Sequence, residues 1–165
     1  AEVIQLCANA SCSSVYQNRT GGLTFKKWDD YAVSDYVIGT AMAYANPDIT
    51  LSKPMRGISV TFNPDEPPFE VVLGTNGEIQ TATNNLIGTI EQAVLVADWM
   101  RIVLESRRTV SGDYRSDPRL DLYDIVTVES KYGAILPVVI TNISYSYSGC
   151  FKATYSGRAI GLGGG

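Results

Sequence analysis

Acidic and basic side chains gather in one segment of the 165-residue chain, between Gly112 and Asp124. The segment holds four carboxylates and two guanidinium groups, from Asp113, Asp117, Asp121, Asp124, Arg115 and Arg119. Carboxylates suit Ca²⁺, but an EF-hand loop needs acids at positions one, three and five, and here they are spaced four, four and three apart. We therefore predict no bound metal. We expect instead a surface loop whose charged residues fix its shape or contact a neighbouring subunit: Arg115, Asp117, Arg119, Asp121 and Asp124.

Catalysis would have to rely on carboxylates, because the chain contains no histidine. That absence removes the commonest general base and every Ser-His and Cys-His pair. A glycosidase needs two acids roughly 5 to 10 Å apart, for which Asp29, Asp30, Glu66 and Glu70 are the candidates. Acids beside a tryptophan or near prolines are more typical of solvated loops. We expect no enzymatic activity, and since no Gly-rich phosphate loop occurs, no cofactor.

The composition narrows the classes of partner. Thirteen Lys and Arg against 17 Asp and Glu give a net charge of -4, which offers no footprint for a nucleic acid. No run of 18 apolar residues occurs, so we expect no membrane span. The three cysteines have no CxxC spacing and predict no disulfide framework. Ten tyrosines and two tryptophans could serve either a carbohydrate-binding or adhesion module, or subunit interfaces.

The first part of the chain predicts a short helix followed by β-structure. Apolar residues at five of the positions between 2 and 9 indicate the helix, and a Gly-containing turn at 18–22 indicates a hairpin. Residues 58–62 alternate apolar and polar, as in a strand with one buried face. The stretch 63–68 holds three prolines and predicts a linker between two lobes.

The second part predicts another hairpin, a long helix and a sheet. Turn residues at 74–77 join the strand-like runs 69–73 and 78–81, and a 3.6-residue apolar period with a capping box predicts a helix over 89–106. Three strands from residue 125 onward predict an antiparallel meander, with Val138–Ile140 buried on both faces. The expected fold is α+β, mostly antiparallel, with lobes 1–63 and 64–160 and a flexible tail 161–165.

Several segments taken together resemble a known family. The run 114–128, YRSDPRLDLYDIVTV, resembles the pattern R-x-D-P-x-L-x-x-x-D-x-[IV] that leads into a strand near the end of tail hub and distal minor structural proteins of bacteriophages and prophages. The strand 139–143 and the hairpin 148–158 are similar to the ending of that module, and residues 4–23 to its opening. Where the family usually has Gly, this sequence has Tyr123, which tolerates a positive φ far less readily.

The resemblance implies a structural role in a tail tip or baseplate hub. It implies a ring-forming homo-oligomer, such as a trimer, that joins other tail proteins. The implied location is the virion tail, with the bacterial cytoplasm before assembly. A non-enzymatic structural protein is therefore the leading hypothesis, and a carbohydrate-binding or adhesion module that uses exposed Tyr and Trp is the alternative.

Overall fold

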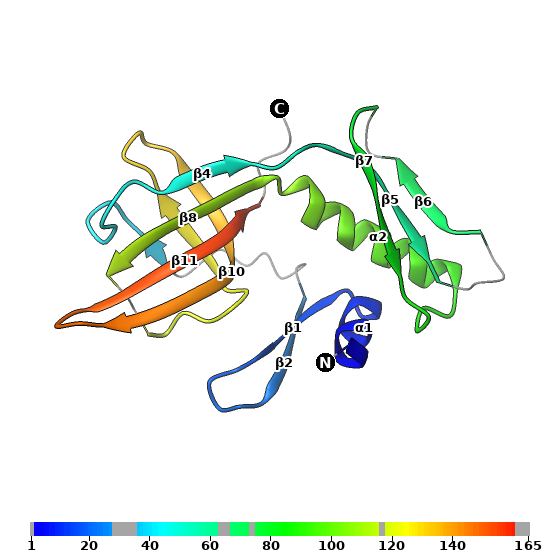
Figure 1. The fold of residues 1–165 in the computed structure, drawn as a ribbon, viewed down its shortest axis with the longest axis horizontal. Coiled ribbons are helices and arrows are strands. Elements are labelled where there is room, and N and C mark those ends of the chain that lie inside the picture. Colours follow the sequence, from blue (N-terminus) through cyan, green and yellow to red (C-terminus); the bar gives the residue numbers. More distant parts are fainter. Residues whose placement is uncertain (1, 28–35, 63–66, 73–74, 116–117, 161–165) are drawn as a thin grey trace. The chain divides into compact units, whose positions relative to one another are not determined.

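The computed structural model describes residues 2–27, 36–62, 67–72, 75–115 and 118–160, and Figure 1 shows its ribbon. The chain forms two compact units, each built from two separate stretches of sequence. Unit 1 comprises Ala1–Asp30 with Lys53–Glu105, and unit 2 comprises Tyr31–Ser52 with Ser106–Gly165. Both units combine strands into sheets, and the two helices lie in unit 1, so the α+β class is confirmed.

The expected division at residue 63 does not follow these units. Strand β5 (Met55–Thr61) pairs antiparallel with β6 (Phe69–Val72). The proline-containing stretch therefore connects two strands of one sheet, although its residues 63–66 lie outside the described residues. The predicted tail 161–165 lies outside them too. Composition could not place the boundary, because pairing between strands decides which stretches share a unit.

Unit 1 opens with a helix and a two-stranded sheet. Helix α1 spans Glu2–Ala10, and strands β1 (Ser13–Gln17) and β2 (Leu23–Lys27) pair antiparallel with Val15 opposite Phe25. The predicted helix and hairpin are confirmed. The Asn18 side chain fixes the turn, since its Oδ1 accepts hydrogen bonds from the backbone N–H groups of Thr20 and Gly22.

The three-stranded sheet of unit 1 has the order β6-β5-β7, with β7 (Glu78–Thr83) parallel to β5. The predicted hairpin between residues 69–73 and 78–81 is therefore wrong, because β6 and β7 each pair with β5 instead of with each other. The predicted buried face of residues 58–62 is confirmed, since Ile58, Val60 and Phe62 lie in the core of unit 1, and Ser59 between them is buried too. A strand this apolar gains most from a central position, where neighbours shield both of its edges.

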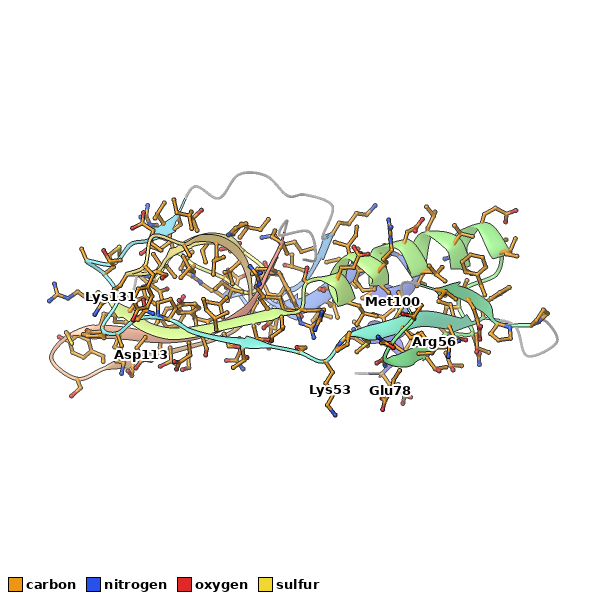
Figure 2. All side chains as sticks on the ribbon, turned by 90° about the horizontal axis from the view of Figure 1, so that it is seen from above. Lys53, Arg56, Glu78, Met100, Asp113 and Lys131 are labelled. Atoms are coloured by element: carbon orange, nitrogen blue, oxygen red, sulfur yellow. The ribbon has the colours of Figure 1, made fainter. Side chains whose placement is uncertain are left out.

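Helix α2 (Ile90–Glu105) confirms the predicted long helix. Its N-cap is Thr89, whose hydroxyl accepts the Gln92 N–H at 3.3 Å. The Gln92 side chain bonds the N–H of Gly88 at 3.2 Å, so only half of the predicted capping box forms. Figure 2 shows Met100 on the side of α2 that faces the sheet. The helix and the sheet enclose a core made by Ile58, Val60, Phe62, Ile87, Ala93, Val96 and Ala97.

Unit 2 is a six-stranded sheet with the order β3-β9-β10-β11-β8-β4. Its strands are β3 (Val37–Ile38), β4 (Asp48–Leu51), β8 (Arg108–Arg115), β9 (Ile125–Glu129), β10 (Ile135–Tyr147) and β11 (Phe151–Ala159). The predicted C-terminal meander is confirmed as β9-β10-β11, and the predicted double-sided burial holds for Val138, Val139 and Ile140. Strand β8 was expected to be loop from Gly112 onward, yet it continues to Arg115 because it pairs with β11.

Candidate interaction sites

The charged segment predicted to fix a loop starts on β8 and runs to the start of β9. Arg115 is the last residue of β8, and its N–H donates to the Met42 carbonyl at 2.8 Å. Asp117 lies outside the described residues. Arg119 is exposed, and the carboxylate of Asp124 accepts the Asp121 N–H at 2.8 Å. The structure thus brings Asp121 and Asp124 together, while the roles of Arg115 and Arg119 stay predictions.

Hydrogen bonds to β10 hold the end of this segment. The Tyr145 hydroxyl donates to the Leu120 carbonyl at 2.6 Å, and the Tyr123 N–H donates to the Ile140 carbonyl at 2.7 Å. Tyr123 adopts a φ of 63°, in the left-handed region that glycine favours. The position at which the resembling family has Gly therefore requires that conformation, and Tyr123 adopts it at a cost of about 1 to 2 kcal/mol.

Asp113 belongs to a different cluster from the one that its sequence position indicated. It lies on β8 opposite Thr154 of β11, and its carboxylate binds the Lys152 ammonium at 2.7 Å and the Thr154 hydroxyl at 2.6 Å. These hydrogen bonds, from Lys152 first, hold the pKa of Asp113 below its ordinary value. The same pair raises the pKa of Lys152. Sequence reasoning missed Lys152, because only the strand register brings it beside Asp113.

Two further side chains extend this cluster. The Lys152 ammonium lies 5.5 Å from the ring centroid of Tyr44, and the Tyr44 hydroxyl lies 3.6 Å from the Cys150 sulfur. The contact with Cys150 raises the pKa of Tyr44. The group is exposed and holds one carboxylate, one ammonium, one phenol and one thiol. Such a set is suited to orienting the hairpin between β10 and β11 rather than to binding a metal.

The candidate acids for metal binding or hydrolysis do not form a pair in the described part of the chain. There, no group of three or more His, Cys, Asp or Glu could hold a metal ion. Glu70 is exposed on β6, and Asp29, Asp30 and Glu66 lie outside the described residues. The glycosidase hypothesis therefore gains no support from the geometry.

A cavity of about 190 Å³ lies within unit 1, between α2 and the neighbouring strand β7 and its following loop. Trp99, Met100 and Ile87 are among its mostly apolar lining residues, and Asn84 adds an amide. The Trp99 indole N–H is buried and has no hydrogen-bond partner among the described residues. The cavity is thus mostly apolar, and its described lining offers no carboxylate for catalysis.

Aromatic residues gather at the far end of the β10–β11 hairpin. The rings of Tyr145 and Phe151 stack at 5.7 Å, and Tyr147 lies 6.5 Å from Phe151. Tyr147 is 76% exposed and Tyr132, in the turn between β9 and β10, is 89% exposed. These are the aromatic side chains that a partner would meet first, whether the partner is a protein or a glycan.

Neither of two comparisons with known protein sequences found a match for the chain. No protein-family model matches the chain. No curated protein matches it significantly. Within the described residues, the helices are too short or too polar to cross a bilayer.

Solved structures, in contrast, share the fold of nearly the whole chain. A tail protein from Neisseria meningitidis MC58 matches with a TM-score of 0.66 at 11% identity, over 95% of this chain and 53% of that chain. The 43 kDa tail protein of prophage MuSo2 from Shewanella oneidensis matches with a TM-score of 0.65 at 13% identity, over 94% and 53%. A chain in the virion of a native gene transfer agent particle gives 0.69 at 14% identity, over 94% and 38%.

The solved structures that match are phage-type tail proteins and a component of a gene transfer agent virion. The chain shares their fold, and it spans about half or less of the length of the solved chains that it matches. Identities of 11 to 14% establish the fold alone.

Proposed function

We propose that this chain is a structural component of a phage or prophage tail, located at the tail tip or baseplate hub, where it assembles through protein–protein contacts and catalyses no reaction. The observation that carries the proposal is the shared fold over 94 to 95% of the chain with two tail proteins and a virion component. The sequence resemblance of segment 114–128 to tail hub proteins supports the hub position. Homo-oligomerisation into a ring, contact with other tail proteins and a cytoplasmic stage before assembly belong to the same proposal.

The surface of unit 2 supports an assembly role. Edge strand β4 is exposed at all four residues, and Ile49 and Leu51 are 45% and 66% exposed on it. An exposed apolar edge strand is a template for pairing with another chain, and proteins that remain monomeric usually blunt such edges. The proposal also gives a role to the charged residues of the loop before β9. They fix the shape of that loop or pair across a subunit boundary: Arg115, Asp117, Arg119, Asp121 and Asp124.

Labelling of particles tests this function. Antibodies raised against the chain, applied to particles made from the genome that encodes it, should label one end of the tail in negative-stain electron microscopy. Unlabelled tails would contradict the proposal. Arg119→Glu should reduce the yield of complete tails while the purified chain stays folded, whereas Lys53→Glu, at another exposed cation, should leave the yield unchanged.

The exposed aromatic residues favour a second candidate, a carbohydrate-binding or adhesion module. Tyr147, at 76% exposure beside Phe151, has the flat exposed ring that stacks on a sugar. A glycan array distinguishes the two candidates. Binding to a defined glycan that is lost in Tyr147→Ala would support adhesion, and an array without signal, together with labelled tails, would support the structural role.

A further inference from the structure

The β1–β2 hairpin is a sheet of two strands with an exposed apolar face. Leu23, Phe25 and Lys27 alternate with Thr24 and Lys26, so they share one face. Leu23 is 55% exposed and Phe25 is 50% exposed. Two-stranded sheets are marginally stable in water unless something covers one face. The turn held by Asn18 presents this face in a fixed register, so the hairpin is preorganised for a partner.

Helix α2 carries a stripe that alternates acidic and apolar residues on the side away from its core. The stripe has spacings of four, three, four and three residues, which keep its members on one line along the helix: Glu91, Leu95, Asp98, Ile102 and Glu105. The core-facing positions Ala93, Val96 and Ala97 lie on the opposite side. Leu95 is 63% exposed, and its neighbours Glu91 and Asp98 are exposed too. Of the two apolar residues in the stripe, Leu95 is exposed and Ile102 is half-buried.

The hairpin and the stripe match in charge. Residues 13–27 hold three cations, Arg19, Lys26 and Lys27, and no acid. Helix α2 holds three acids and one cation, Arg101, which lies 3.8 Å from Asp98, so its net charge is -2. On the face of Leu23 and Phe25 the cation is Lys27, which an encounter between two copies brings towards the acids of α2.

The two surfaces also match in length. Leu23 to Lys27 spans roughly 13 Å along the strand, and Leu95 to Glu105 spans roughly 15 Å along the helix. The hairpin presents Leu23 and Phe25 with Lys27 beyond them, and the helix presents Leu95 between Glu91 and Asp98. The apolar residues of the hairpin can thus contact Leu95 while Lys27 lies near an acid of the stripe.

We propose that the outer face of α2 in one copy of this chain binds the β1–β2 hairpin of a second copy. The contact is heterologous, because the two surfaces are different, and repeated contacts of this kind close into a ring or continue as a filament. The inference rests on the proposed function in naming the partner as a second copy. It differs from pairing of the β4 edge, which would use unit 2.

Disulfide trapping tests the pairing directly. In a background with the exposed Cys7 and Cys150 changed to Ser, one preparation carries Phe25→Cys and a second, differently tagged, carries Leu95→Cys. Mild oxidation of the mixture should give a mixed dimer, and each preparation alone should stay uncrosslinked. Ile135→Cys is the matched control partner, because Ile135 is 64% exposed and Leu95 is 63% exposed.

Three outcomes would overturn the proposal: no mixed dimer, mixed dimers with Ile135→Cys as abundant as those with Leu95→Cys, or dimers of Phe25→Cys with itself. Sedimentation velocity of the unmodified full chain gives a second measurement. Leu95→Ser should raise the dissociation constant for self-association roughly tenfold or more, and Ile135→Ser should not. A full chain that stays monomeric at every concentration would also contradict the inference.

The particle-labelling experiment separates failure of this inference from failure of the proposed function. Labelled tails without the mixed dimer leave the structural role intact and remove the hairpin–helix contact. A mixed dimer with unlabelled tails does the reverse.

Discussion

Alanine and glycine at position 123 test the backbone conformation that the structure assigns there. Tyr123 has a φ of 63°, and in that region an alanine costs about 1 to 2 kcal/mol that glycine avoids. Glycine carries an opposing cost of about 0.4 to 1 kcal/mol, because it has more conformational freedom in the unfolded chain. Both variants lose the same half-buried ring, so the difference between them reports the backbone. Tyr123→Gly should therefore be more stable than Tyr123→Ala by about 0.5 to 1 kcal/mol.

The sign of this difference is the diagnostic result. At an ordinary position alanine is the more stable of the two, and Ala134→Gly, at an exposed residue whose φ is not positive, should lower the free energy of unfolding by about 0.4 to 1 kcal/mol. Urea denaturation followed by far-ultraviolet circular dichroism measures both comparisons, and hydrogen exchange of the β10 amides assigns the transition to unit 2. If Tyr123→Ala proves more stable than Tyr123→Gly, the left-handed conformation at this position is refuted.

Four further predictions concern single positions. Gly157→Ala should lower the free energy of unfolding by about 3 kcal/mol, because a Cβ there would overlap the carbonyl of the facing strand β10; Gly88→Ala, with open space around it, should change it by less than about 1 kcal/mol in urea denaturation. Thr89→Ala should cost about 1 kcal/mol by loss of the α2 N-cap, and the urea midpoint of unit 1 measures it. Because folding lowers the pKa of Asp113, its ionised carboxylate stabilises the fold at pH values above 3.8, the pKa in the unfolded chain. This stabilisation disappears as the pH falls through the lower pKa of the folded state. Stability should accordingly drop more on acidification in the native chain than in Asp113→Asn, and equal drops would contradict the ion pair. Burial raises the pKa of Tyr155 to about 12. The neutral phenol therefore stabilises the fold fully below about pH 10, and this stabilisation is lost as the pH rises towards 12. Tyr155→Phe should remove this loss of stability at alkaline pH, as measured by denaturation curves.

Local patterns in the sequence were sufficient to predict the elements themselves. The apolar period of α2 repeats along a helix of 16 residues, and β10 opens with six consecutive non-polar residues, Ile135 to Ile140. In each case several neighbouring residues favour the same element. The hairpin around Asn18 was predictable for a different reason, since its turn chemistry and its pairing involve neighbours in sequence.

The order of the strands in unit 1 was not predictable from local turn signals. The Gly-containing turn at 74–77 indicates a hairpin, yet β7 pairs with β5. Gly77 has a φ of 112°, and a Cβ there would overlap the backbone of Pro54. The glycine thus permits close approach to the start of β5 rather than a turn between β6 and β7. Strand order depends on how the faces of the sheet are buried against the rest of the unit, and a turn motif carries no information about that burial.

The candidate site was predictable only where its contacts are local. Asp121 and Asp124 are three residues apart and do interact, as the spacing indicated. Asp113 was assigned to the same loop, but its partners lie on β11, about forty positions further along the chain. Only the register of β8 against β11 brings them together, and register is set by the burial of Val110, Tyr114 and Tyr155 on the other face.

The conformation of Tyr123 shows how the fold dominates a local preference. Its N–H donates to the Ile140 carbonyl at 2.7 Å, and the Ile140 N–H donates to the Asp124 carbonyl at 2.9 Å. These two bonds connect the segment to the buried middle of β10, so abandoning the positive φ would leave two polar groups unpaired, at a cost of about 1 to 3 kcal/mol each. That cost exceeds the strain of about 1 to 2 kcal/mol, and the tyrosine therefore stays in the left-handed region. The same bonds anchor the C-terminal end of segment 115–124 to a central strand, and such anchoring is what a loop needs if its charged residues are to meet a neighbouring subunit in one fixed arrangement.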